Sequence, residues 1–399
     1  MKQYWLFMVN CICNILFCAA DSAFSNGISI DAVVVMGCFV PIEWLGMQFL
    51  RMGCFAYQTY QKYEKNCMLI SIGCGIITGT IVISCAVPIS NLFALSEAQK
   101  HLLQGILRIY GFCMPMEAAS RFMQTYVTYK CYNKLAITAN VLTYFIIIGT
   151  DWLSVVMGWD LYGIIAATEL SWFVYLIILA VACKIWKSED KIDLHIIKKC
   201  VLHAKDLLIS RSLSRFATII MTRFISKIGE YNYAIYSVCI GAVSLAEECR
   251  DATVDYALVV LREAKDKFIT VRKTLKQCFT PSLLLQIGFA YGALIFMHGK
   301  VGLKDCIVYL PFYMLPMLTY QLYDIIFAYF MSIHNTKVTF LRGIISCFWR
   351  IPIAMLIDYF SGGLIAYAFL FLCDYLSITI VYYILYHKDK QKFKKLQFN

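Results

Sequence analysis

Charged residues are scarce in this chain. Of its 399 residues only 15% are Asp, Glu, Lys or Arg, whereas 60% are hydrophobic. Soluble domains carry about 25% charged residues, so this composition excludes an ordinary soluble protein. The apolar residues come in blocks of about 20, the length that crosses a bilayer. Strands of a membrane barrel would instead alternate over runs of about ten residues. The sequence therefore predicts an all-α polytopic membrane protein.

Several chemistry-bearing motifs are also missing. The chain has no glycine-rich phosphate loop, which excludes ATP as an energy source bound by this chain, and no His-rich metal-binding helix. Its 18 cysteines lie mostly singly inside the apolar blocks, where cysteine usually acts as a small hydrophobic residue. The start of the chain lacks an Ala-x-Ala-like cleavage site and is interpreted as the first helix. We expect no cofactor, no metal and no enzyme activity.

About twelve apolar spans follow one another along the chain. Each is long enough to cross the hydrocarbon core as a helix. They are expected at 3–22, 30–50, 67–89, 103–128, 136–157, 162–183, 205–226, 232–260, 279–298, 305–332, 338–358 and 363–386.

Lysine and arginine are unevenly distributed among the connecting segments. If the N-terminus is cytoplasmic, the cytoplasmic segments hold 25 of the 36 Lys and Arg residues. The opposite loops hold only Lys100, Lys227, Lys300 and Lys304. This bias fits the positive-inside rule and predicts a multi-pass protein of the plasma membrane with both termini in the cytoplasm. The net charge of +11 then reflects membrane topology, so no nucleic-acid partner is expected.

The chain divides into two similar halves. The predicted parts are a six-helix bundle at 1–183, a cytoplasmic linker at 184–204, a second six-helix bundle at 205–387 and a basic tail at 388–399. SNGISIDAVVVMG in the first half parallels SKIGEYNYAIYSV in the second, and YVTYKCYNKLAIT parallels YFMSIHNTKVTF, both at an offset of about 202 residues. Repeats of equal orientation are common in secondary transporters, which bind substrate between the halves.

One predicted helix carries a one-sided acidic stripe. In GAVSLAEECRDATVDYALVVL the acids Glu247, Glu248, Asp251 and Asp255 fall within an arc of about 100°. A carboxylate at the bilayer centre costs about 2.5–3.5 kcal/mol, so four of them cannot face lipid. They must face protein, water or one another.

Basic residues on the preceding helix offer partners for this stripe. Arg211, Arg215 and Arg223 lie within an arc of about 120°. Matched depth predicts that Arg215 pairs with Asp251 and Arg211 with Asp255, whereas Arg250 is expected to point away from the stripe. Two interpretations stay open: an internal ion-pair network, or the lining of a hydrated cavity that binds substrate charges or protons. We favour the cavity, because a structural pair rarely needs four acids on one face.

Four segments in order resemble the multidrug and toxic compound extrusion (MATE) family. They are DSAFSNGISIDAVVVMG, LLQGILRIYGFCMPMEAASRFMQTYVTYKCYNKLAI, MTRFISKIGEYNYAIYSVCIG and QLYDIIFAYFMSIHNTKVTF. They resemble the family's first helix and following loop, its fourth helix, the connection between helices seven and eight, and its tenth helix. The resemblance covers nearly the whole chain and implies a twelve-helix exporter that alternates between inward-facing and outward-facing states, coupled to protons or sodium.

Two acids carry over from the family. Asp21 stands where one branch has its first-helix carboxylate, and Asp324 where another has its tenth-helix carboxylate. Ser214 replaces the helix-seven Glu of the sodium-coupled branch, so a sodium site of that type is not expected. Outside the resemblance, Glu117 and Arg121 are spaced i,i+4 and are expected to pair; Glu117 is kept as a candidate site residue.

The resulting hypothesis is a monomeric secondary exporter in the lipid bilayer. It would move small amphiphilic, cationic or peptide-like compounds out of the cell, driven by H⁺ or Na⁺. The alternative is a lipid-linked oligosaccharide flippase of the same wider superfamily, because Arg211 and Arg215 would suit an anionic lipid carrier. A scaffold or receptor without transport activity is the third reading; the buried charges and the repeat count against it.

Overall fold

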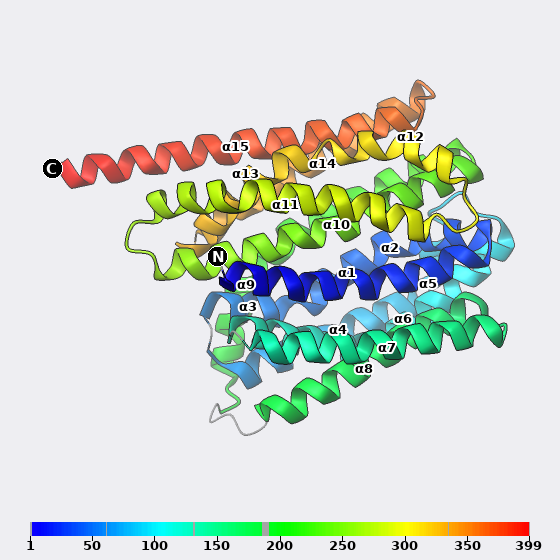
Figure 1. Ribbon diagram of the computed structural model, residues 1–399, viewed down its shortest axis with the longest axis horizontal. Coiled ribbons are helices and arrows are strands. Elements are labelled where there is room, and N and C mark those ends of the chain that lie inside the picture. Colours follow the sequence, from blue (N-terminus) through cyan, green and yellow to red (C-terminus); the bar gives the residue numbers. More distant parts are fainter. Residues whose placement is uncertain (1, 61, 131, 186–190, 334, 399) are drawn as a thin grey trace.

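Helices account for nearly all of the described chain. The computed structural model describes residues 2–60, 62–130, 132–185, 191–333 and 335–398, and none of these residues forms a strand. The long helices lie side by side, and the two chain ends lie at the same end of the bundle (Figure 1). The predicted fold class, an all-α polytopic protein, is confirmed.

The helices follow one another with short connections. In chain order they are α1 (Lys2–Ile28), α2 (Ile30–Leu50), α3 (Met52–Tyr60), α4 (Glu64–Ser84), α5 (Ala86–Ser90), α6 (Glu97–Tyr129), α7 (Asn133–Val156), α8 (Asp160–Cys183), α9 (Leu194–Ile225), the 3₁₀ turn η2 (Ser226–Ile228), α10 (Glu230–Glu263), α11 (Lys267–Met297), α12 (Leu303–Met314), α13 (Met317–Ser332), α14 (Thr336–Tyr359) and α15 (Leu364–Phe398).

Each of the twelve expected spans coincides with one helix or with two consecutive helices. The span expected at 305–332 is split into α12 and α13, because Pro316 lacks a backbone N–H and its ring clashes with the preceding turn. Within the described residues, seven helices are apolar and long enough to cross a membrane: α2, α4, α7, α8, α11, α14 and α15. Neither α9 nor α10 is among them, because both carry many charged side chains.

Local sequence explains several helix boundaries. The Ser29 hydroxyl accepts a hydrogen bond from the Ala32 N–H and caps α2. Ser96 and Gln99 form a reciprocal capping box at the start of α6. Gly229 has φ of 121° where the chain turns from η2 into α10, a conformation that favours glycine.

The predicted linker contains the first turns of α9. Residues 194–204 are helical, and the Asp193 carboxylate caps them by accepting from the His195 N–H. The segment just before α9 is tied to α4, because the Asn66 side chain donates to the Lys191 carbonyl at 2.9 Å and accepts from the Asp193 N–H at 2.9 Å. The connection is therefore held against the first half of the chain.

Helices of the first half pack mainly on one another, as do those of the second half. Contacts between the halves run mainly through α1 with α10 and α11, through α2 with α9 and α10, and through α3 with α9. At the end away from the termini, Asn26 donates to the Met297 carbonyl at 2.7 Å. At the other end, the Tyr129 hydroxyl donates to Asp255 at 3.2 Å. The division into two domains stays a prediction.

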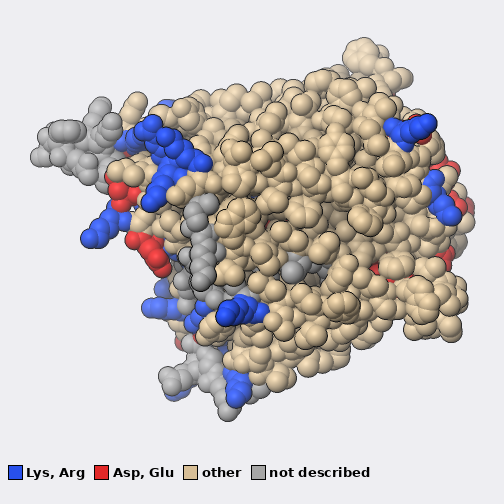
Figure 2. Space-filling model, viewed as in Figure 1, with Lys and Arg blue, Asp and Glu red and all other residues tan. Residues whose placement is uncertain are grey.

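The outer surface suits a bilayer. Large apolar side chains such as Ile77, Phe145 and Phe348 are exposed along the middle of the helices. Figure 2 shows a broad band without charged residues, with Lys and Arg side chains gathered mainly at the end that carries both termini. This pattern follows the loop bias in the sequence, whereas the orientation itself stays a prediction.

Glycines bring α4 and α6 into close contact. A Cβ atom at Gly79 would overlap the Gly111 carbonyl oxygen, and one at Gly75 would lie 2.7 Å from the Pro115 Cα. Small residues spaced by four allow membrane helices to approach closely. A Cβ at Gly73, on the same helix, would meet nothing within 4 Å.

We predict that Gly79→Ala separates α4 from α6 and lowers the free energy of unfolding by about 1–3 kcal/mol, the usual cost of overpacking. Thermal unfolding of the purified protein in detergent measures the effect. Gly73→Ala is the matched control and should be neutral or slightly stabilising, because alanine favours helix over glycine. Equal melting temperatures for the two variants would contradict the packing argument.

Candidate functional site: a charged cavity between the halves

A cavity of about 240 Å³ lies between helices of both halves. Its walls come from α1, α2, α6, α7 and α8 on one side and from α9 and α10 on the other. A second hollow of about 130 Å³ adjoins it and shares Arg51, Arg121, Glu248 and Asp251 with it. This second hollow reaches Asp255 and Tyr129, toward the end that holds the termini.

The acidic stripe of α10 lines these hollows. Glu247, Glu248 and Asp251 border the central cavity, and Asp255 borders the adjoining one. Asp251 has 54% of its side chain exposed there. The opposite face of α10 is buried in the protein and includes Ala242, Ala246, Cys249 and Thr253 among its small residues. The four acids thus lie along internal space, as expected from the cost of exposing them to lipid.

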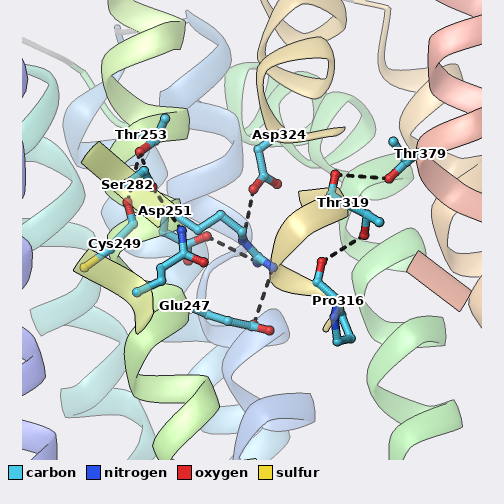
Figure 3. A network of polar contacts seen from close by, with 11 residues as sticks. Glu247, Cys249, Asp251, Thr253, Ser282, Pro316, Thr319, Asp324 and Thr379 are labelled. Atoms are coloured by element: carbon cyan, nitrogen blue, oxygen red, sulfur yellow. Dashed lines mark hydrogen bonds and ion pairs between the residues drawn. The ribbon is translucent and has the colours of Figure 1, made fainter. Parts of the chain in front are cut away.

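Arg250 is the main counter-ion of the stripe, and our expectation that it points away was wrong. Its guanidinium lies 3.4 Å from Glu247, 3.5 Å from Asp251 and 3.3 Å from Asp324. Figure 3 shows these three acids converging from α10 and α13 on one side chain. Only 8% of the Arg250 side chain is exposed, and Tyr320 packs against the guanidinium at 4.8 Å. A long flexible arginine can bend back to acids that its Cα direction does not face.

Neither predicted couple, Arg215 with Asp251 or Arg211 with Asp255, forms a direct ion pair. Among the described residues no ion pair joins either couple; Asp251 pairs with Arg250, and Asp255 accepts from Tyr129. The prediction assumed that α9 and α10 pack together, but α9 packs against α14, α2 and α3, whereas α10 packs against α11, α13 and α1. Matched depth along the membrane normal therefore did not bring the side chains together.

The two arginines of α9 instead lie against aromatic rings. The Arg215 guanidinium is 4.6 Å from the centre of the Trp44 ring, and that of Arg211 is 5.0 Å from the Phe55 ring. Both still border the cavities, Arg215 together with Asp251 and Arg211 together with Asp255. Arg223 is exposed near the far end of α9 and borders none of these hollows.

The first half contributes a second set of charges. Glu117 pairs with Arg121 at 2.6 Å, which confirms the i,i+4 prediction, and Trp172 packs on the guanidinium at 4.5 Å. Asp21 accepts a hydrogen bond from the Thr168 hydroxyl at 2.6 Å. All five side chains border the central cavity.

Several charged lining residues were not among the predicted site residues, including Arg121 and Arg250 described above. Glu43 and Glu169 border the central cavity beside Glu117. Arg51 and Arg342 border a third hollow of about 60 Å³ with Asp324 and Ser214. The two arginines were assigned to cytoplasmic segments because they stand at the edges of apolar blocks. In the structure Arg51 directly follows the last residue of α2 and Arg342 lies in the second turn of α14, and from these helix ends both side chains border the hollow.

The fold and the internal charged cavity define a polytopic membrane protein built around a polar space between two sets of helices. Comparison with protein-family models finds no match, and comparison with curated protein sequences finds none either.

Solved structures share the fold across nearly the whole chain. An inward-facing multidrug resistance MATE family transporter of the MOP superfamily matches with a TM-score of 0.75 at 16% identity, covering 95% of this chain and 95% of that chain. An outward-facing structure of such a transporter matches with a TM-score of 0.75 at 15% identity over 99% of this chain and 96% of that chain. A MOP superfamily transporter from Pyrococcus furiosus, described as having a binding pocket of reverse polarity, matches with a TM-score of 0.75 at 14% identity over 98% and 95%. The chain has the MATE transporter fold, as its motifs indicated.

Replacing Arg250 should destabilise the protein strongly. Arg250→Met would leave Asp324, which is 4% exposed, without its counter-ion, and breaking a buried pair costs about 3–5 kcal/mol. Thermal unfolding in detergent should show a lower melting temperature, and adding Asp324→Asn should recover part of the loss. Arg223→Met, at an exposed position of α9, serves as the control. An Arg250→Met protein as stable as this control would refute the assignment of Arg250 as the central counter-ion.

Proposed function

We propose that this protein is a secondary active exporter of the MATE type. It moves small amphiphilic, cationic or peptide-like compounds out of the cell by alternating access, coupled to H⁺ or Na⁺. The observation that carries this proposal is the central cavity, which is bordered by helices of both halves and by acids and arginines together. Secondary transporters of repeat architecture bind their substrates in such a place. The proposed setting is the plasma membrane, with a monomeric protein and both termini in the cytoplasm.

Contacts between the halves at both ends of the bundle fit alternating access. Away from the termini, Gln99 donates to Asp31 at 2.6 Å and to Glu230 at 3.1 Å, so that one amide links α6 with α2 and α10. Toward the termini, Tyr129 of α6 binds Asp255 of α10. In the proposed cycle, one set of contacts breaks while the other persists, which opens the cavity to one side of the membrane at a time.

Competition for shared carboxylates would couple transport to the driving ion. Arg250 holds Glu247, Asp251 and Asp324 on one guanidinium. A proton on one of these acids weakens its pairing with Arg250, and a cationic group of the substrate competes for the same oxygens. A ligand shifts a conformational equilibrium only through a difference in affinity between the two states. We propose that protonated and substrate-bound carboxylates favour different states, with Asp21 and Asp324 taking part.

The alternative, a lipid-linked oligosaccharide flippase, is favoured by one observation. Arg51, Arg211, Arg215 and Arg342 gather beside the cavity, where they would suit an anionic carrier. Proteoliposomes separate the two functions. The exporter is supported if a soluble fluorescent dye moves across the membrane in response to an imposed pH or sodium gradient. The flippase is supported if a fluorescent anionic lipid moves between leaflets and the dye does not move. Neither movement would reject both.

We predict that Glu247→Gln with Glu248→Gln abolishes gradient-driven transport or shifts its pH dependence, because two cavity carboxylates lose their ability to bind protons. Asp324→Asn should slow transport as well. Dye transport in proteoliposomes between about pH 5.5 and 8 measures both effects, since carboxyls involved in proton exchange would titrate near neutral pH.

Glu97→Gln is the matched control, because Glu97 is 81% exposed at the start of α6 and pairs only with Lys100 among the described residues. It should transport as the unmodified protein does. If the double variant shows the same pH profile as the control, the stripe has no role in coupling. If Asp324→Asn transports at the full rate, Asp324 is not needed.

A further inference from the structure

The third hollow is strongly basic. It is bordered by five arginines and two aspartates, and it shares Arg51, Arg215, Arg250 and Asp251 with the central cavity. Arg51 follows the last residue of α2, Arg211 and Arg215 come from α9, and Arg342 comes from the second turn of α14. We call Arg51, Arg211, Arg215 and Arg342 the arginine group.

The two aspartates of this hollow are already paired. Asp251 and Asp324 both contact Arg250. Across the part of the chain that the structure describes, the ion pairs found include no member of the arginine group. The Nε atoms of Arg211 and Arg342 are buried and have no hydrogen-bond partner there.

Aromatic rings hold three of these guanidiniums in place. Phe55 lies 5.0 Å from Arg211, Trp44 lies 4.6 Å from Arg215 and Tyr323 lies 5.3 Å from Arg342. Contact with a ring face stabilises the cation and uses none of its N–H donors. The side chains are therefore positioned while their hydrogen-bonding edges are left for another partner.

Four cations around one small space repel each other, and the membrane setting gives them little water. An anion between them would relieve this repulsion and accept their hydrogen bonds. The planar guanidinium fork matches the oxygen spacing of carboxylates and phosphates. The arginine group thus fits an acidic group of that kind.

The wall of the central cavity formed by α1, α2, α6 and α8 is acidic. Asp21, Glu43, Glu117 and Glu169 border the cavity from these helices, and within their described bounds Arg121 is the one arginine that does so. Helices α9 and α10 contribute both signs of charge to the cavity, and the arginine group adds positive charge in the adjoining third hollow. A substrate that carries a positive group and a negative group would find acids on this wall and arginines in that hollow.

We propose that the arginine group binds a carboxylate or phosphate of an amphoteric substrate, whose cationic end faces the acidic wall of α1, α2, α6 and α8. This inference rests on the proposed function, since it names the chemical class of the transported compound. Charge at both ends would fix the orientation of the substrate and would select it over purely cationic compounds.

A pair of rhodamine dyes tests the acidic-group site. One dye bears a free carboxylate beside its cationic ring system, and the other is its ethyl ester, which is only cationic. Fluorescence anisotropy measures their affinity for the purified full-length protein in detergent. The free acid should bind the unmodified protein more tightly. In the double variant Arg211→Gln and Arg342→Gln, its affinity should fall roughly tenfold or more, the effect of losing hydrogen bonds between charged groups.

The ester should keep its affinity within about twofold in that variant, because it makes no anionic contact with the arginines. Arg223→Gln, outside these hollows, should change neither dye. Equal losses for both dyes, or no loss for the acid, would overturn the proposal. If the double Gln variant does not fold, Arg211→Lys with Arg342→Lys keeps the charge but removes the fork, and it should still weaken the acid more than the ester.

Competition identifies the source of the acidic group. Phosphoserine is soluble and amphoteric, whereas dihexanoyl phosphatidic acid is an anionic lipid. Displacement of the acid dye by phosphoserine supports an amphoteric soluble substrate. Displacement by the lipid alone overturns it in favour of a lipid headgroup, and displacement by neither overturns the acidic-group site.

Dye transport in proteoliposomes keeps the two proposals distinguishable. Selective binding of the acid without gradient-driven movement would reject the exporter and leave the site. Movement of both dyes without selectivity for the acid would leave the exporter and reject the site.

Discussion

A charge inside a membrane protein must be matched by another polar group or by water, and this constraint organises the interior of the bundle. Arg250 satisfies it for three acids at once. The pair between Arg250 and Asp324 also links α10 to α13. Arg121 satisfies the constraint for Glu117 in the first half. Within the second half, Arg350 and Asp374 form another buried ion pair, between α14 and α15.

Positive and negative charges are distributed unevenly around the central cavity and the hollow beside it. Acids dominate the wall formed by α1, α2, α6 and α8, whereas arginines gather where α9, α14 and the end of α2 meet. Arg250 stands between the two sets and contacts acids on α10 and α13. Because ion pairs in a poorly hydrated space are sensitive to each added or removed charge, a change at one wall will be felt at the other. The coupling proposed above would act through side chains in contact with a single guanidinium.

The sequence allowed the helical fold, the positions of the spans and the internal placement of the α10 acids to be predicted, because all of these follow from apolar periodicity and the cost of exposed charge. The partners of the acids could not be predicted. Predicting whether Arg215 pairs with Asp251 requires knowing which helices pack against each other. The periodicity of apolar residues along the sequence does not give this information. Arg51 and Arg342 escaped notice for another reason: they lie at or near the ends of apolar blocks, where lysine and arginine were counted as cytoplasmic.

The length of α9 has a mechanical consequence. Its 32 residues span about 48 Å at 1.5 Å per residue, well beyond the roughly 30 Å of a hydrocarbon core. The segment just before it is fastened to α4 through Asn66, while Arg211 and Arg215 lie further along the same rod. The helix α9 is thus hydrogen-bonded near its first residue to the first half, and it carries two cavity arginines near its middle. Because the helix is continuous, its start and its arginines move together. If the halves rock as proposed, α9 must tilt with them, and the tilt would displace Arg211 and Arg215 together with the wall of the cavity that they border.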